Sequence, residues 1–141
     1  MSIFFIRRKI DPQPYIERAK VMGIRFNTAL KEGDKDEALY TAPRLMENVI
    51  KYAVALKGGR PLSGVNLDIH LPYLIGKIED REDYEQARRA IINAFQIYSD
   101  MAEERFSYLR ENGVDIELGE LECIFRDFVD NMEVYLEEEL F

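Results

Sequence analysis

The sequence has one cysteine, one histidine and no apolar run long enough to cross a membrane. Cys123 has no second cysteine with which to form an internal disulfide, so the composition favours a reducing compartment and we expect a cytoplasmic protein. A membrane-spanning helix needs about 18 or more consecutive apolar residues, so none is expected. Zinc sites and Cys–His nucleophiles need more ligands or partners than Cys123 and His70 supply. We therefore predict no structural metal.

Sequence motifs that mark common cofactor and nucleophile sites are also absent. There is no glycine-rich phosphate loop followed by a lysine, and there is no Gly-x-Ser-x-Gly sequence. No glutamate stands three positions before His70, so the Glu-x-x-His pairs of a di-iron bundle are missing. We therefore predict no cofactor and no catalytic residue, and we favour a role that is not enzymatic.

Acidic residues are concentrated at the C-terminal end of a chain whose net charge is −8. Residues 114–141 hold ten acidic residues and one basic residue, whereas residues 1–113 hold 18 basic and 17 acidic residues. An acidic segment repels nucleic acid phosphates, and the basic residues elsewhere are scattered, so we expect no nucleic acid partner. The segment suits a protein partner with a basic surface.

Two pairs of acids in this segment are spaced one helical turn apart, namely Glu117 with Glu120 and Asp127 with Asp130. The spacing resembles the Glu-x-x-Glu and Glu-x-x-Asp pairs with which all-helical nucleotide pyrophosphatases hold magnesium. In those enzymes the two pairs come from different helices, whereas here both fall on one predicted helix and cannot face each other. We therefore favour a solvated acidic face, and a degenerate pyrophosphatase is a further alternative.

Apolar residues recur at steps of three and four along most of the chain, which predicts an all-α fold. The longest predicted helix runs from Asp80, a good N-cap, to the stop signal at Asn112–Gly113. Roughly 30 residues at about 1.5 Å each give a rod of about 45 Å. We expect the bundle to be organised around this rod, with Ile91 in its core.

Two helices are expected before the longest one. Asp11–Pro12 opens the first and Gly33 ends it, and Asp34 caps the second. Pro43 lies inside the second helix and should kink it or split it near Thr41, which could act as a second cap. The predicted apolar face of the first helix comprises Tyr15, Ala19, Met22, Phe26, Ala29 and Leu30.

The remaining predicted elements complete a bundle. Gly58–Gly59 ends the second helix, a short helix follows over about residues 71–78, and the last helix begins between Asp115 and Gly119. We expect an up-and-down bundle of four main helices and one short helix, forming a single domain over residues 11–141.

Residues 1–10 form an arm that is apolar and then basic. A signal peptide has the opposite order, so none is predicted. Burial of a large apolar side chain stabilises a protein by about 1.5–3 kcal/mol. The apolar arm and the uncovered part of the long helix both need a surface that buries them, so we expect a homo-oligomer, most simply a two-fold dimer. The basic residues Arg7–Lys9 are expected to lie against Glu137–Glu139. The candidate interface residues of the arm are Ile3, Phe4, Phe5 and Ile6.

Residues 42–75 resemble part of the HEPN superfamily of helical bundles. The resemblance rests on a second helix, a glycine-ended turn and a histidine before a short helix, here Ala42, Lys51, Ala53, Leu56, Gly59, His70, Leu71 and Leu74. In the ribonuclease members an arginine lies four to six residues before a histidine on a late helix. Here Asn93 and Ala94 follow Arg88 and Arg89, so the resemblance implies a member that lacks the catalytic histidine.

His70 could act as a switch or a base, and Asp68 is its nearest acidic neighbour in the sequence. The alternative is that its ring caps the short helix or satisfies a buried carbonyl. We expect a non-catalytic interaction or assembly module, and the alternative is a HEPN-like RNA-processing or toxin–antitoxin component without ribonuclease activity. The other candidate functional residues are Arg60, Arg88, Arg89 and Asn93.

Overall fold

The computed structural model describes residues 10–61, 75–76, 78–102 and 117–141. Over these ranges the chain forms four helices and no strand, so the prediction of an all-α fold is confirmed. None of the helices described there is long and apolar enough to cross a membrane. The helices are α1 (Gln13–Glu32), α2 (Lys35–Leu56), α4 (Arg81–Ala102) and α6 (Leu118–Leu136).

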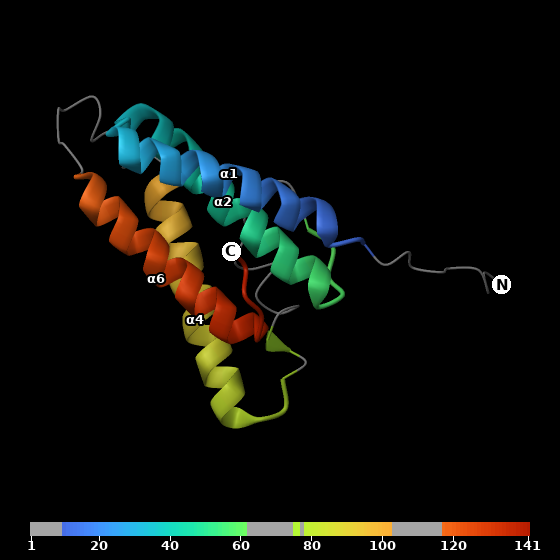
Figure 1. Ribbon diagram of the computed structural model, residues 1–141. Helices are drawn as coiled ribbons and strands as arrows, with labels where there is room; N and C mark the ends of the chain where they lie inside the picture. The colour runs from blue at the N-terminus through green and yellow to red at the C-terminus, as the bar shows by residue number, and fades with distance from the viewer. Residues whose placement is uncertain (1–9, 62–74, 77, 103–116) are drawn as a thin grey trace.

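Helix α2 occupies the centre of the described bundle. Figure 1 shows α1 and α2 as a hairpin, with α4 and α6 beneath it. α2 packs against each of the other three helices, and α4 packs mainly against α6. Among the described residues, the helix around which the others pack is therefore α2, and not the helix that follows Asp80 as predicted.

Local sequence signals set the turn between α1 and α2. Gly33 adopts a left-handed conformation with φ of 71°, and its N–H donates to the carbonyls of Ala29 and Leu30. The Asp34 carboxylate then accepts a hydrogen bond from the backbone N–H of Glu37 at 3.2 Å. These interactions satisfy backbone groups that helix ends leave without partners, as predicted for both residues.

The start and the buried face of α1 differ by about one residue from the prediction. The Asp11 carboxylate accepts from the backbone N–H of Gln13 at 3.0 Å, and Pro14 rather than Pro12 lies in the first turn. Ile16 is buried where the predicted face had Tyr15, which is only partly buried. The buried face of α1 is rotated relative to the predicted one because α1 packs against α2 on one side and approaches α6 on the other.

Helix α2 continues through Pro43, so the predicted split near Thr41 is wrong. Proline removes one backbone hydrogen-bond donor from the helix. The residues around Pro43, including Ala42 and Leu45, are buried. Thr41 is fully buried, and its hydroxyl donates to the carbonyls of Glu37 at 2.8 Å and Ala38 at 3.3 Å. Thr41 is therefore an interior helix residue and not a cap.

The predicted ends of the remaining helices are confirmed where the structure describes them. Gly59 closes α2 by donating its backbone N–H to the Val54 carbonyl at 2.9 Å. The Asp80 carboxylate caps α4 by accepting from the N–H of Asp83 at 3.0 Å. α6 begins at Leu118, inside the predicted interval. Residues 103–116, and most of the short helix expected over residues 71–78, lie outside the described residues.

The C-terminal segment folds back onto the bundle after α6. Glu137 ends the helix in a left-handed conformation with φ of 55°. The backbone N–H of Leu140 donates to Oε1 of Glu133 at 3.1 Å, and Leu140 is 1% exposed. The Tyr52 hydroxyl on α2 lies 2.9 Å from both carboxylate oxygens of Glu138. The expected contact of Glu137–Glu139 with the basic arm involves residues outside the described ranges.

Stability should fall as the pH rises through the range in which Tyr52 ionises. Burial, followed by the hydrogen bond to Glu138 and the negative charge of that residue, raises the pKa of Tyr52 from 10.0 to about 12. The folded protein therefore holds the proton more tightly than the unfolded chain. The stabilisation is complete below a pH of about 10 and is lost between about 10 and 12. Urea denaturation over this range measures the effect.

Tyr52→Phe is the matched variant for this measurement, because it removes the ionisable hydroxyl and keeps the ring. The variant should lose stability less steeply above a pH of about 10. A residual slope is expected, because burial also raises the pKa of Tyr135. Identical slopes for the two proteins would contradict the link between Tyr52 and stability.

Candidate interaction surface

The structure places some of the candidate residues predicted from the sequence. Arg60 is exposed just after α2. Arg88, Arg89 and Asn93 are exposed on α4, with Asn93 about one turn after the two arginines. His70, Asp68 and the arm residues Ile3, Phe4, Phe5 and Ile6 lie outside the described residues.

The two acidic pairs both lie on or beside α6, as predicted. Glu117 is the residue before the helix, and Glu120, Asp127 and Asp130 are exposed along it. Over the described ranges no three side chains of the metal-binding types come together. All four acids are exposed to solvent.

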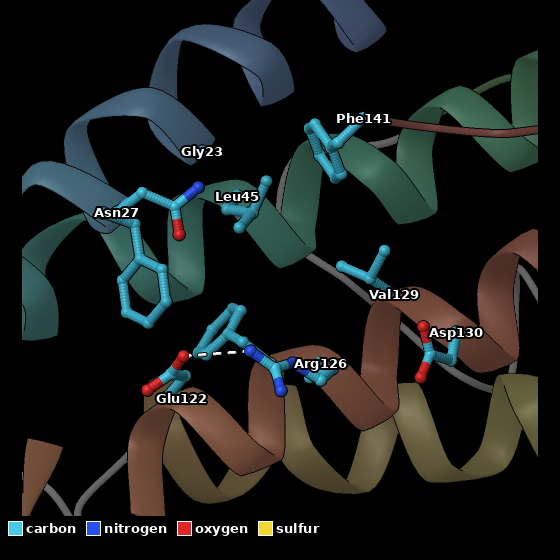
Figure 2. A pocket seen from close by; sticks show the side chains of 10 residues that line it. Gly23, Asn27, Leu45, Glu122, Arg126, Val129, Asp130 and Phe141 are labelled. Carbon is cyan, nitrogen blue, oxygen red and sulfur yellow. Dashed lines mark hydrogen bonds and ion pairs between the residues drawn. The ribbon is translucent and has the colours of Figure 1, made fainter. Parts of the chain in front are cut away.

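A pocket of about 190 Å³ is lined by residues of α1, α2 and α6. Figure 2 shows Phe141 beside Leu45, and an ion pair between Glu122 and Arg126 on the α6 side. A Cβ atom at Gly23 would lie 3.3 Å from Cε1 of Phe141, so glycine lets the ring approach α1 closely. The protein's own aromatic side chain thus occupies part of this space.

The outer face of the α1–α2 hairpin combines exposed apolar side chains with arginines. Val21 is 54% exposed and Ile24 is 68% exposed. Beside Val21 runs an open groove of about 460 Å³. Pro14, Glu17, Arg18, Val21, Met22, Arg44 and Asn48 line this groove. We call the groove, together with Ile24, the hairpin face.

Stacking on Tyr40 holds Arg44 in place at the edge of the hairpin face. The guanidinium carbon of Arg44 lies 3.6 Å from the centroid of the Tyr40 ring, and its Nη1 donates to the Tyr40 carbonyl at 2.8 Å. Arg25 lies on the same ring at 5.4 Å and pairs with the Glu37 carboxylate at 2.6 Å. Cation–π stacking of this kind reduces the motion of a long side chain and leaves its charge in place.

Two arginines of the hairpin face have no carboxylate partner among the described residues. The guanidinium of Arg44 stacks on Tyr40 and donates to its carbonyl, and the guanidinium carbon of Arg18 lies 5.6 Å from the centroid of the Tyr15 ring. Both arginines border apolar side chains in the groove, including Val21 and Met22. Exposed aliphatic residues beside arginine, methionine and tyrosine resemble the composition of protein interfaces.

The outward side of α6, which we call the acidic face, has the opposite charge. Its residues follow one another at steps of four and three, so they lie along one side of the helix. Ile124 is 36% exposed and Val134 is 52% exposed. The acidic face comprises Glu120, Ile124, Asp127, Asn131 and Val134, with Asp130 at its edge.

Comparison of the chain with protein-family models, with curated proteins and with solved structures finds no match. The HEPN resemblance stays a prediction. Sequence reasoning missed the hairpin face, although a signal was present. Val21 and Ile24 are large apolar residues that fall off the predicted apolar face of the first helix.

Proposed function

We propose that this protein is a non-catalytic assembly module that associates with further copies of itself. The observation that carries the proposal is the hairpin face, where the exposed Val21 lines a groove with Arg18 and Arg44 and the exposed Ile24 lies one turn further along α1. Neither arginine has a carboxylate partner among the described residues. Exposed apolar groups next to a groove gain free energy when a partner covers them. Arginines at the edge of the patch give such contact specificity.

The surroundings of the arginines on α4 support a role without RNA cleavage. A nuclease of the HEPN type would need a histidine near Arg88 or Arg89, and α4 offers Asn93 and Ala94 there. Neither side chain can take up a proton at neutral pH. The exposed free thiol of Cys123 supports a reducing location, which we infer to be the cytoplasm.

Light scattering after gel filtration tests self-association. The chain has a mass of 16.5 kDa, and we expect a molar mass of at least twice this value at tens of micromolar, falling on dilution. Ile24→Asp should lower the mass at equal concentration, because it places a charge in the hairpin face. A monomeric mass for the unmodified protein over this range would refute the proposal.

Gln96→Asp is the control for Ile24→Asp, since it adds the same charge at an exposed position on α4. The control should keep the mass of the unmodified protein. An equal loss in both variants would show that net charge, rather than the hairpin face, governs association.

A further inference from the structure

The hairpin face and the acidic face are complementary in charge, and each also carries exposed aliphatic side chains. In the hairpin face the exposed Val21 lines one groove with Arg18 and Arg44, and the exposed Ile24 lies one turn further along α1. We propose that the acidic face of a second copy docks on the hairpin face. This inference rests on the proposed self-association and names the surfaces that carry it.

Charge decides between this arrangement and a two-fold interface made of like surfaces. The segment from Glu117 to Phe141 holds nine acidic residues and one basic residue, and that base, Arg126, is paired with Glu122 at 3.0 Å. Two acidic faces would therefore repel each other. Two hairpin faces would bring Arg18 and Arg44 together with their counterparts, with few acids to neutralise them. The mixed pairing instead places Arg18 and Arg44 opposite acidic residues of α6.

The spacing of side chains on α6 suits the groove of the hairpin face. Asp127 lies three residues from Ile124, which is about 4.5 Å along the helix axis. A copy that places Ile124 near Val21 thus brings Asp127 within reach of the long side chains of Arg18 and Arg44. Stacking on Tyr40 already restrains Arg44, so less side-chain freedom is lost when the salt bridge forms.

An interface between two different surfaces leaves one surface of each kind uncovered on every pair of copies. The uncovered hairpin face and the uncovered acidic face can each receive another copy. The assembly therefore grows into a ring or an open chain, unlike the two-fold dimer expected from the sequence. The mass should rise beyond two copies as concentration increases.

Two double variants test the pairing. Arg18→Gln with Arg44→Gln disables the hairpin face, and Asp127→Asn with Asp130→Asn disables the acidic face. Each variant alone should associate at least about ten-fold more weakly than the unmodified protein, because charged pairs are lost. Their equimolar mixture should form a complex of two copies that grows no further, since it contains one intact face of each kind.

The controls use charges away from both faces. Glu82→Gln with Glu85→Gln changes two acids on α4 and should leave the mass unchanged. Circular dichroism and melting temperature confirm that every variant is folded, which is expected because the substituted side chains are exposed or partly exposed. Raising the salt from about 0.1 to 1 M should weaken association, since screening becomes stronger.

Each outcome separates this inference from the proposed function. If the unmodified protein is oligomeric and both double variants keep its mass, the pairing is wrong and self-association stands. If only the hairpin variant dissociates, two hairpin faces meet and the pairing is wrong. If the equimolar mixture of the two double variants does not associate, the pairing of the hairpin face with the acidic face is also wrong. If the unmodified protein is monomeric, both proposals fail.

Discussion

Replacing Ile91 by aspartate should destabilise the folded protein by about 4–5 kcal/mol or prevent folding altogether. Ile91 is 1% exposed in the middle of α4, so the new carboxylate would be buried without a partner. The stability of a domain is typically about 5–15 kcal/mol, and the expected loss is a large part of it. Urea denaturation followed by circular dichroism measures the change.

Asn93→Asp is the matched control for Ile91→Asp, because it introduces a carboxylate on the same helix at an exposed position. Its effect should stay within about 0.5 kcal/mol. A loss below about 0.5 kcal/mol for Ile91→Asp itself would contradict the packing of α4 described above.

Phe128→Ala should cost about 3–5 kcal/mol. Phe128 is 1% exposed, and its ring centroid lies 6.4 Å from that of Phe125 in an edge contact. Phe125 in turn lies 4.5 Å from Phe26 of α1, so the three rings connect α6 to the hairpin. Truncation removes the ring and leaves a cavity that the neighbouring helices fill only in part. The free energy of unfolding, measured in denaturant, checks this value.

Phe141→Ala provides the comparison within one residue type. Phe141 is 52% exposed and packs on Gly23 at one edge. Because water already covers half of its ring, its loss should cost about 1 kcal/mol. Similar losses for Phe128→Ala and Phe141→Ala would show that the burial of Phe128 does not determine its contribution.

Helix boundaries could be predicted because their causes are local. Asp34 and Asp80 each accept a hydrogen bond from an N–H three residues ahead, so the interaction depends only on neighbouring sequence. Gly33 tolerates the left-handed conformation that ends α1 without help from distant residues. The start of α6 between Asp115 and Gly119 and the core position of Ile91 also followed from the local sequence pattern.

Features that depend on distant contacts could not be predicted in this way. Pro43 alone favours a broken helix, and α2 stays continuous because residues on both sides of it are buried against other helices. The exposure of Val21 and Ile24 depends on which side of α1 meets α2. The link between Tyr52 and Glu138 joins residues 86 positions apart. None of these contacts has a signature in the neighbouring sequence.

The alanines of the first two helices limit how this protein can diverge. Small residues bring helices close together, and Ala19, Ala38, Ala42 and Ala53 are 0% exposed. A larger side chain at any of them would push apart neighbours that are already in contact. Relatives should therefore keep glycine, alanine or serine at these positions long after surface residues have changed. A relative with phenylalanine in place of Ala42 and an otherwise unchanged core would contradict this constraint.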